Sequence, residues 1–351
     1  MELLKQTIAQ IDPPDQQAIK SARERLDSLT KPPGSLGRLE EIAYRLAGIQ
    51  GQAIPELPRE KVMMVLAGDH GVVAEGVSAF PQEVTPQMVA NFLRGGAAIN
   101  VLSRQAGARV VVADIGIAGP PLPWPGLIDC RVKPGTDNFV LGPAMSRTEA
   151  VQAIEAGIKL VYQQVQGQPA LVGTGEMGIG NTTPSSAILA VFGGLSPREV
   201  TGRGTGIDDA RLVHKAAVIA RAIEVNRPDP NDGLDVLAKV GGLEIAGLAG
   251  VILGCAARRL PVVIDGFISG AAALVARSLA PLSREYMFAS HLSNEPGHRL
   301  MLEMLDLKPM LQLDMRLGEG TGAALAFPLL EAAIRVINEM ATFAEAGVSQ
   351  V

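Results

Sequence analysis

One carboxylate stands in a sequence context that suits proton transfer. Glu319 lies between two glycines and follows an apolar stretch, residues 311–317, that we expect to end as a strand. In parallel α/β proteins, ligands bind at the carboxyl ends of the strands. Partial removal of a carboxylate from water raises its pKa and suits it to general-base catalysis. The alternative is an acid that only stabilises the start of the following helix through the helix dipole.

Three segments hold glycine at alternate positions, and each precedes a helical pattern. Glycine lets a ligand approach the backbone, and the free N–H groups at the start of a helix attract anions. Each segment alone would also fit an ordinary strand–helix turn. Because three occur in one chain, we predict a phosphorylated ligand. The segments are 173–183, 202–209 and 318–326, and they contain ten of the 39 glycines.

The first of these segments matches the G-x-G-x-x-G pattern of dinucleotide-binding proteins. That pattern also expects an acidic residue at the end of a second strand about 20 residues later. The region near Glu199 instead has the composition of a helix end or loop. A dehydrogenase is therefore disfavoured, and no G-x-x-x-x-G-K-[ST] motif supports a nucleoside triphosphatase.

Other polar residues also follow expected strands. Asp69 and His70 occur in AGDHGV, where we expect an Asp–His hydrogen bond that positions loops. Only four histidines are present, with no H-E-x-x-H or C-x-x-C motif, so no metal site is predicted. Lys215 could face the phosphate loops or lie in solvent. Asp265 ends the strand-like PVVID, a position suited to binding ribose hydroxyls.

Composition excludes several classes of function. The formal net charge is −5 and no cluster of Lys and Arg occurs, which argues against nucleic acid and anionic membranes as partners. The apolar run 245–257 is too short to span a bilayer. No signal peptide is visible, and the two distant cysteines, Cys130 and Cys255, suit a reducing compartment. We expect a cytoplasmic protein.

Short apolar runs alternate with longer helical patterns after residue 60. Such alternation predicts an α/β fold with a parallel sheet that helices cover on both faces. The expected strands are 62–66, 109–112, 170–172, 262–264 and 310–313. The expected helices include 151–165, 208–225, 243–258 and 267–279.

Both ends of the chain have helical periodicity instead. Apolar residues between 36 and 46 share one helix face, and Ser35 is placed to cap that helix. A second stripe covers 329–340. We therefore predict a small helical domain from residues 1–55 and 325–351, beside a large α/β domain of residues 56–324.

The order of the motifs resembles the nicotinate-nucleotide–dimethylbenzimidazole phosphoribosyltransferase family over nearly the whole length. The matching segments are LTKPPGSLGRLE, AGDHGV, PQEVT, GPAMS, GTGEMGIGNTTPSSA, GRGTGIDD, NRPDPNDGLDVLAKVGG, PVVIDGFISGAAAL, SHLSNEPGH and RLGEGTGAALA.

The resemblance implies that an aromatic base, typically 5,6-dimethylbenzimidazole, displaces nicotinate from nicotinate mononucleotide with inversion. Glu319, in R-L-G-E-G, would be the catalytic base, with neither cofactor nor metal. It also implies a Rossmann-like domain, a small helical domain and a homodimer. The implied nucleotide-binding residues are Glu176, Gly178, Asn181, Gly204, Lys215, Asp265, Ser293 and Gly322; the implied base-binding residues are Phe80, Met88, Met177 and Leu317.

Two alternatives to this reaction remain open. The enzyme could accept other aromatic bases, because Phe80 and Met88 give the base pocket an apolar wall where some relatives have polar residues. The chain could instead be a nucleotide-binding protein without turnover, which the presence of Glu319 disfavours.

Overall fold

A six-stranded parallel sheet forms the centre of the computed structural model, which describes residues 1–349. The strand order is β3-β2-β1-β4-β5-β6, the order of a Rossmann fold, and it confirms the expected α/β class. The long strands β1 and β4 are buried on both faces because their sequences are almost continuously apolar or small. The strands are β1 (Glu60–Gly68), β2 (Arg109–Gly116), β3 (Leu127–Asp129), β4 (Ala170–Met177), β5 (Val262–Ile264) and β6 (Met287–Ala289).

Four of the five expected strands are present, and the fifth is wrong. Residues 310–313 form no strand; Leu311 makes a single bridge to His291, and residues 312–314 are exposed. Pro309 has no N–H to donate at this point, and the partner strand β6 has already ended at Ala289. Strands β3 and β6, each only three residues long, were not expected from the sequence.

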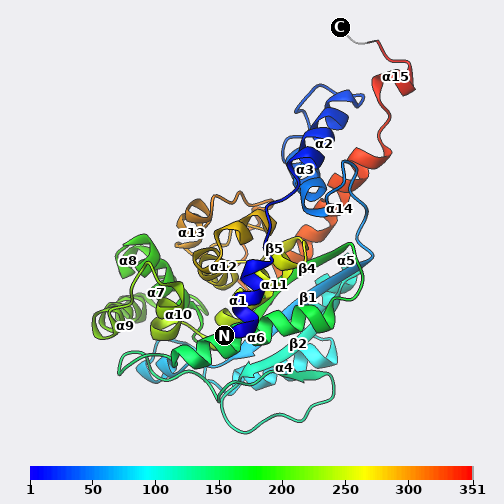
Figure 1. Cartoon of the computed structure of the whole chain (residues 1–351). Coiled ribbons are helices and arrows are strands. Elements are labelled where there is room, and N and C mark those ends of the chain that lie inside the picture. The colour runs from blue at the N-terminus through cyan, green and yellow to red at the C-terminus, as the bar shows by residue number, and fades with distance from the viewer. Residues whose placement is uncertain (350–351) are drawn as a thin grey trace.

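One face of the sheet is covered by three helices, α6 (Arg147–Gln164), α11 (Leu243–Ala257) and α12 (Phe267–Leu279). Helix α11 is buried nearly throughout and packs directly on α6 (Figure 1). Glycines permit this close approach: a Cβ atom on Gly157 would lie 1.8 Å from the carbonyl oxygen of Gly247. These glycines serve helix packing, a use that was not expected from the sequence.

The opposite face is covered by α5 (Ala98–Ala106) and the first part of α14 (Thr321–Glu339), which pack on each other. Helix α4 (Val84–Arg94) lies at the carboxyl end of β1. There, Thr85 donates a hydrogen bond to Asp69 and accepts one from the N–H of Ile179. These contacts join α4 to the loop that follows β4.

The second part of α14 projects from the body together with α2 (Gln16–Ser28) and α3 (Arg38–Gln50), as Figure 1 shows. Arg259 ties this projection to the body by donating to the carbonyl oxygens of Gly48 and Ile49. Helix α3 begins at Arg38 after Gly37 as N-cap, so the expected cap at Ser35 is wrong. The turn 34–37 contains two glycines with positive φ, which delays the helix start.

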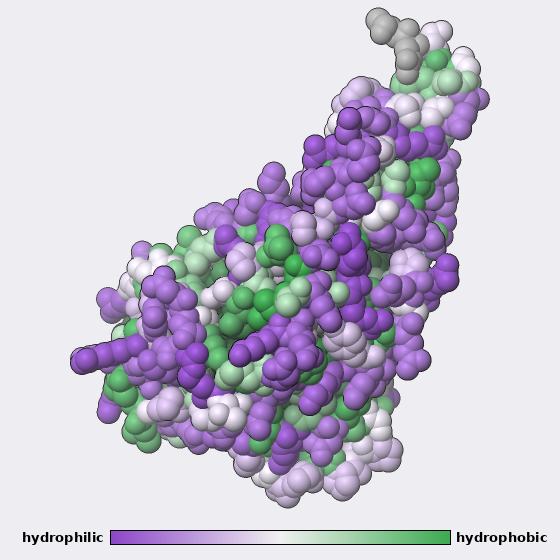
Figure 2. Space-filling model, viewed as in Figure 1, coloured by the Kyte–Doolittle hydropathy of each residue, from purple (hydrophilic) through white to green (hydrophobic). Residues whose placement is uncertain are grey.

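The projecting helices α2, α3 and α14 come from both ends of the chain, as the predicted small domain does. Helix α1 (Glu2–Ala9) packs instead on α6 and α11 of the body. The division at residues 55 and 325 stays a prediction. Within residues 1–349, α14 is the one helix long and apolar enough to cross a membrane, and 56% of that stretch is buried in the protein. Figure 2 shows a mostly hydrophilic surface over this projection on the face in view.

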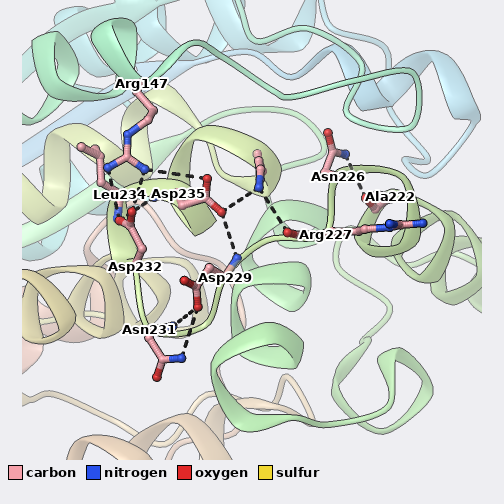
Figure 3. A network of polar contacts seen from close by, with 10 residues as sticks. Arg147, Ala222, Asn226, Arg227, Asp229, Asn231, Asp232, Leu234 and Asp235 are labelled. Atoms are coloured by element: carbon pink, nitrogen blue, oxygen red, sulfur yellow. Dashed lines mark hydrogen bonds and ion pairs between the residues drawn. The ribbon is translucent and has the colours of Figure 1, made fainter.

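Four helices gather at the far end of the body from this projection (Figure 1). They are α7 (Thr182–Gly193), α8 (Pro197–Val200), α9 (Asp209–Asn226) and α10 (Gly233–Val240). Figure 3 shows how the α9–α10 loop is held: Arg147 pairs with Asp232 and Asp235, and Asp235 also accepts from the N–H of Asp229. The remaining elements are α13 (His298–Leu305), α15 (Phe343–Ala346) and the 3₁₀ segments η1 (Gly71–Glu75) and η2 (Pro281–Tyr286).

Candidate active site

A cavity of about 340 Å³ opens at the carboxyl ends of the strands, between loops that follow β4, β5 and β6. Loops from distant parts of the chain meet here, including the segments before α9 and α14. Twelve of the thirteen residues expected in the site line this cavity: Phe80, Met88, Glu176, Met177, Gly178, Asn181, Gly204, Lys215, Asp265, Ser293, Leu317 and Glu319.

Gly322 is the residue that does not line the cavity. It lies behind Asp265, and a Cβ atom there would come within 2.0 Å of the Nδ1 of His291. Its N–H donates to the Asp265 carboxylate at 2.7 Å. Any contact of Gly322 with a nucleotide stays a prediction.

Glu319 lies in the loop before α14 with a φ of +63°, and it is buried. No strand precedes it, so the expected strand end at 311–317 is wrong. Its Oε2 accepts the N–H of Ile99, at the start of α5, at 3.2 Å. Burial raises the pKa of Glu319, the Ile99 N–H lowers it, and the charge of Asp265 raises it further. The result is a carboxylate at the cavity with a raised basicity.

Asp265 fixes the loop that carries Glu319. Its carboxylate accepts hydrogen bonds from the N–H groups of Gly320, Gly322 and Ala323 at 3.2, 2.7 and 3.2 Å. These donors include the first turn of α14, whose dipole favours an acid at this position. Burial raises the pKa of Asp265 to about 7 despite these donors. This carboxylate already accepts hydrogen bonds from three backbone N–H groups. The expected contact of Asp265 with ribose hydroxyls stays a prediction.

Glu176 is a second buried carboxyl beside the same loop. Its Oε2 accepts from the amide of Asn181. Burial raises its pKa to about 8, with help from the negative charges of Asp265 and Glu244. At neutral pH Glu176 therefore carries a proton, whereas a typical glutamate does not.

Cationic groups gather at another part of the cavity. Lys215 is buried on α9, and its Nζ donates to the Oγ1 of Thr182 at 2.6 Å. A Cβ atom on Gly204 would lie 3.5 Å from that Nζ. Burial lowers the pKa of Lys215 to about 8, although the charge of Glu295 raises it. The sequence left open whether Lys215 faces the glycine loops or lies in solvent. In the structure its side chain is buried beside the loop at Gly204.

Two arginines and one acid also line this part of the cavity, although the sequence did not predict them as site residues. Arg316 donates to the carbonyl oxygen of Gly204 at 2.7 Å, and Glu295 accepts the Gly204 N–H at 3.0 Å. Arg203 also lines the cavity. Arg203 and Arg316 stand in the quoted motifs GRGTGIDD and RLGEGTGAALA. A positive charge beside a glycine-rich segment is a pattern from which their place at an anion site could have been predicted.

The side chains of Phe80, Met88, Met177 and Leu317 give the cavity an apolar wall. Phe80 and Leu317 are 50% and 59% exposed, so this wall opens toward solvent. An aromatic ring with few polar groups would find dispersion contacts here.

Asp69 and His70 do position loops, but the expected hydrogen bond between them is wrong. The Asp69 carboxylate accepts from Thr85 at 2.7 Å and from the N–H of Ala118 at 2.9 Å. His70 pairs instead with Glu244 at 2.9 Å, with both side chains fully buried. Burial opposes protonation of His70, but the charge of Glu244 raises its pKa.

Among residues 1–349, no group of three or more His, Cys, Asp and Glu side chains is arranged to hold a metal ion. The cavity does place several groups together: a basic carboxylate, a neutral carboxyl, a buried lysine and an apolar wall. These groups can hold an anionic sugar phosphate beside an aromatic ring and remove a proton.

Comparison with known proteins agrees with this geometry. A family model described as phosphoribosyltransferase matches residues 11–348. A relative from Desulforamulus reducens is 74% identical over 350 residues and covers both chains fully, and one from Chloroflexus aggregans is 61% identical over 350 residues, 100% of this chain and 99% of its own. Both are named nicotinate-nucleotide–dimethylbenzimidazole phosphoribosyltransferase. The crystal structure of CobT from Thermus thermophilus superposes with a TM-score of 0.91 at 51% identity, over 95% of this chain and all of that one.

Proposed function

Because the chain belongs to the nicotinate-nucleotide–dimethylbenzimidazole phosphoribosyltransferase family, we propose that its cavity transfers the phosphoribosyl group of nicotinate mononucleotide to 5,6-dimethylbenzimidazole. The products are α-ribazole 5′-phosphate and nicotinate, in the lower-ligand branch of cobalamin synthesis. One observation supports the assignment most strongly. Glu319, a buried carboxylate of raised pKa, lies in the same cavity as an apolar wall and a buried lysine.

The chemistry needs one base and careful positioning. The pyridinium nitrogen of the substrate is positively charged, so the bond from C1′ to nicotinate breaks without an acid. One nitrogen of the benzimidazole forms the new bond to C1′ from the opposite face. The proton on its other nitrogen passes to Glu319. General-base assistance contributes about 10²–10⁴-fold, and the alignment of both reactants contributes further.

The oxygen atoms of Glu319 suit this role. Oε2 is held by the N–H of Ile99, which fixes the carboxylate. The one hydrogen bond that residues 1–349 make to this carboxylate is on Oε2, so Oε1 is free to take the proton. The raised pKa favours proton capture near neutral pH.

The phosphate of the nucleotide is assigned to the cationic region. Lys215, whose Nζ lies beside the glycine loop at Gly204, would supply the charge. Ser293 also lines the cavity. Two residues later in the same loop, Glu295 accepts the Gly204 N–H, which brings this loop to the phosphate region. Arg316, held on the Gly204 carbonyl, adds a second positive charge.

The acceptor base is assigned to the wall of Phe80, Met88, Met177 and Leu317. Methyl groups on the benzimidazole suit these apolar side chains. The apolar nature of this wall supports a second candidate, a transferase that also accepts other aromatic bases, because dispersion contacts with a flat ring do not require its methyl groups.

The chain is further proposed to act as a homodimer in the cytoplasm. The exposed apolar side chains of Phe80 and Leu317 at the cavity mouth support a cover from a second copy. Light scattering of the purified protein tests the dimer, and a monomer at the concentration of the assay would refute it. Fractionation of the producing cells tests the location.

The test of function is incubation with nicotinate mononucleotide and 5,6-dimethylbenzimidazole, followed by mass detection of the α-riboside 5′-phosphate and of nicotinate. Adenine and unsubstituted benzimidazole in parallel reactions separate a strict from a relaxed acceptor. Binding of the nucleotide with no product from any base would refute the transferase and favour the non-catalytic alternative.

A further inference from the structure

His291 is a buried side chain of the cavity wall to which no role has been given so far. It follows β6 and is only 2% exposed. Its Nδ1 lies 4.0 Å from Asp265, which holds the Glu319 loop, and Ser293 follows two residues later. His291 therefore lies between Asp265 and Ser293: a Cβ atom on Gly322 would meet His291 and Asp265, and one on Gly266 would meet His291 and Ser293.

The neighbours of His291 determine which ring nitrogen carries its proton. The hydroxyl of Ser290 lies 2.9 Å from the carbonyl oxygen of Asp265 and 3.1 Å from the Nδ1 of His291. A carbonyl oxygen can only accept, so the single Ser290 proton points to Asp265. Ser290 Oγ must then accept from His291, and the proton of the neutral ring is on Nδ1.

The other ring nitrogen is left as an acceptor. A neutral imidazole with its proton on Nδ1 has a lone pair on Nε2. Within residues 1–349, Nε2 makes no hydrogen bond, and it belongs to a side chain that lines the cavity. Gly266 stands beside it, and a Cβ atom there would lie 3.6 Å from Nε2. The absence of a side chain at Gly266 leaves the nitrogen accessible to a ligand.

Burial keeps this nitrogen unprotonated. Burial lowers the pKa of His291, so the ring stays neutral at physiological pH. The ring of His298 lies 6.2 Å away between centroids and is itself neutral, because burial lowers its pKa to about 3. A neutral nitrogen acceptor requires a donor group on the ligand, which phosphate and carboxylate oxygens do not supply at this pH.

On the basis of the proposed function, we propose that the Nε2 of His291 accepts a hydrogen bond from a ribose hydroxyl of nicotinate mononucleotide. The ribose joins the phosphate to the reacting carbon. His291 lies between Asp265, which holds the Glu319 loop, and Ser293, whose loop continues to the phosphate region. The acceptor base also carries an N–H, but Glu319 takes that proton. His291 thus favours a nucleotide that carries this hydroxyl over the analogue that lacks it.

Two variants separate the two ring nitrogens. In His291→Asn the amide stands where Nδ1 stood, so it can still donate to Ser290, but nothing replaces Nε2. In His291→Gln the amide reaches the position of Nε2. Thermal unfolding of each variant shows whether the fold is kept. Ser290→Ala is a third variant, which changes no side chain of the cavity wall. It removes the acceptor that fixes the ring tautomer, together with the hydrogen bond to the Asp265 carbonyl oxygen.

The measurement is calorimetric binding of nicotinate mononucleotide and its 2′-deoxy and 3′-deoxy analogues. We expect the wild type to bind one analogue about tenfold more weakly than the ribonucleotide, the size of one neutral hydrogen bond. His291→Asn should bind the ribonucleotide about tenfold more weakly and lose the preference over that analogue. His291→Gln should keep part of the preference, and Ser290→Ala should reduce it. The analogue that shows the effect identifies the hydroxyl.

An unchanged preference in folded His291→Asn would overturn the proposal, as would a wild type that does not discriminate between the three nucleotides. The outcome is independent of turnover. If the wild type binds the nucleotide but forms no product, the proposed function fails while the binding preference still tests His291. If product forms and the preference survives in His291→Asn, only the role of His291 fails.

Discussion

The Nζ of Lys215 lies 2.6 Å from the Oγ1 of Thr182, inside the cavity and against the backbone of Gly204. Lys215 is 1% exposed, so this is a buried amine at a helix–loop junction and not a surface lysine. Burying an ammonium costs free energy unless a partner compensates for the lost water. An anionic ligand in the cavity would provide that compensation.

Lys215→Ala should therefore weaken the binding of nicotinate mononucleotide by about 10–100-fold, the value of a hydrogen bond to a charged group. Calorimetry measures the affinity. Lys159→Ala, at an exposed lysine on α6, is the control and should bind as the wild type does. Equal affinity of the Lys215 and Lys159 variants would remove Lys215 from the phosphate site.

The neutral carboxyl of Glu176 predicts a pH dependence of stability. Its pKa is about 8 in the folded protein against an ordinary value of 4.5, so the folded state binds a proton that the unfolded chain releases. The free energy of unfolding should then fall as the pH rises from about 5 to about 8. In Glu176→Gln, which carries no titrating group at this position, the slope should be smaller.

Urea unfolding at several pH values measures this slope. Glu224→Gln, at an exposed position on α9, is the matched control and should retain the slope of the wild type. A slope in Glu176→Gln as steep as that of the wild type would contradict the buried neutral carboxyl. Part of the slope is expected to remain in the variant, because Asp265 has a pKa of about 7.

Thr85 joins α4 to the loop after β4 through two buried hydrogen bonds. Thr85→Val would leave Asp69 without one donor at 2.7 Å and the Ile179 N–H without its acceptor at 3.1 Å. The loss should be about 2 kcal/mol or more in the free energy of unfolding. Thr7→Val is the control, because the buried Thr7 hydroxyl has no partner among residues 1–349.

Denaturant unfolding of both threonine variants measures the difference. Thr7→Val should be neutral or slightly stabilising, since no hydrogen bond is lost. If Thr85→Val were no less stable than Thr7→Val, Thr85 would not hold α4 to the loop.

The contact between α6 and α11 depends on glycine. Because a Cβ atom at Gly157 would collide with the Gly247 carbonyl at 1.8 Å, Gly157→Ala must push the two helices apart. We expect a destabilisation of about 1–3 kcal/mol or more. At Gly142 a Cβ atom would meet nothing within 4 Å, so Gly142→Ala should be nearly neutral. Similar thermal midpoints for the two variants would contradict the close packing.

Long and strongly apolar elements could be predicted from the sequence. Helix α12 begins and ends where the pattern places it, because its apolar run stands between Gly266 and the helix-ending segment at Ala280. The strands β3 and β6 could not be predicted, because three residues carry no usable periodicity and their pairing depends on neighbours distant in sequence. Residues 310–313 show the opposite case, in which an apolar pattern predicts a strand that does not form. Leu311 makes a single bridge, to His291.

Much of the candidate site was also predictable, because glycine loops at strand ends and the motif around Glu319 are visible as patterns. The surroundings of each residue could not be predicted from the sequence. Lys215 could have been in solvent, and only the fold places it on Thr182. His291 and Glu295 stand in a polar loop with no apolar pattern, and they meet Asp265 and Gly204 only when distant loops converge.

In the proposed reaction, Glu319 takes the proton from the incoming base. Turnover of Glu319→Gln with nicotinate mononucleotide and 5,6-dimethylbenzimidazole, followed by mass detection of the riboside phosphate, tests this role most directly. Glutamine keeps the shape and the hydrogen bond from Ile99 but cannot accept the proton. Turnover should fall by at least about a hundredfold, with nucleotide binding retained. Turnover close to that of the wild type would contradict this role.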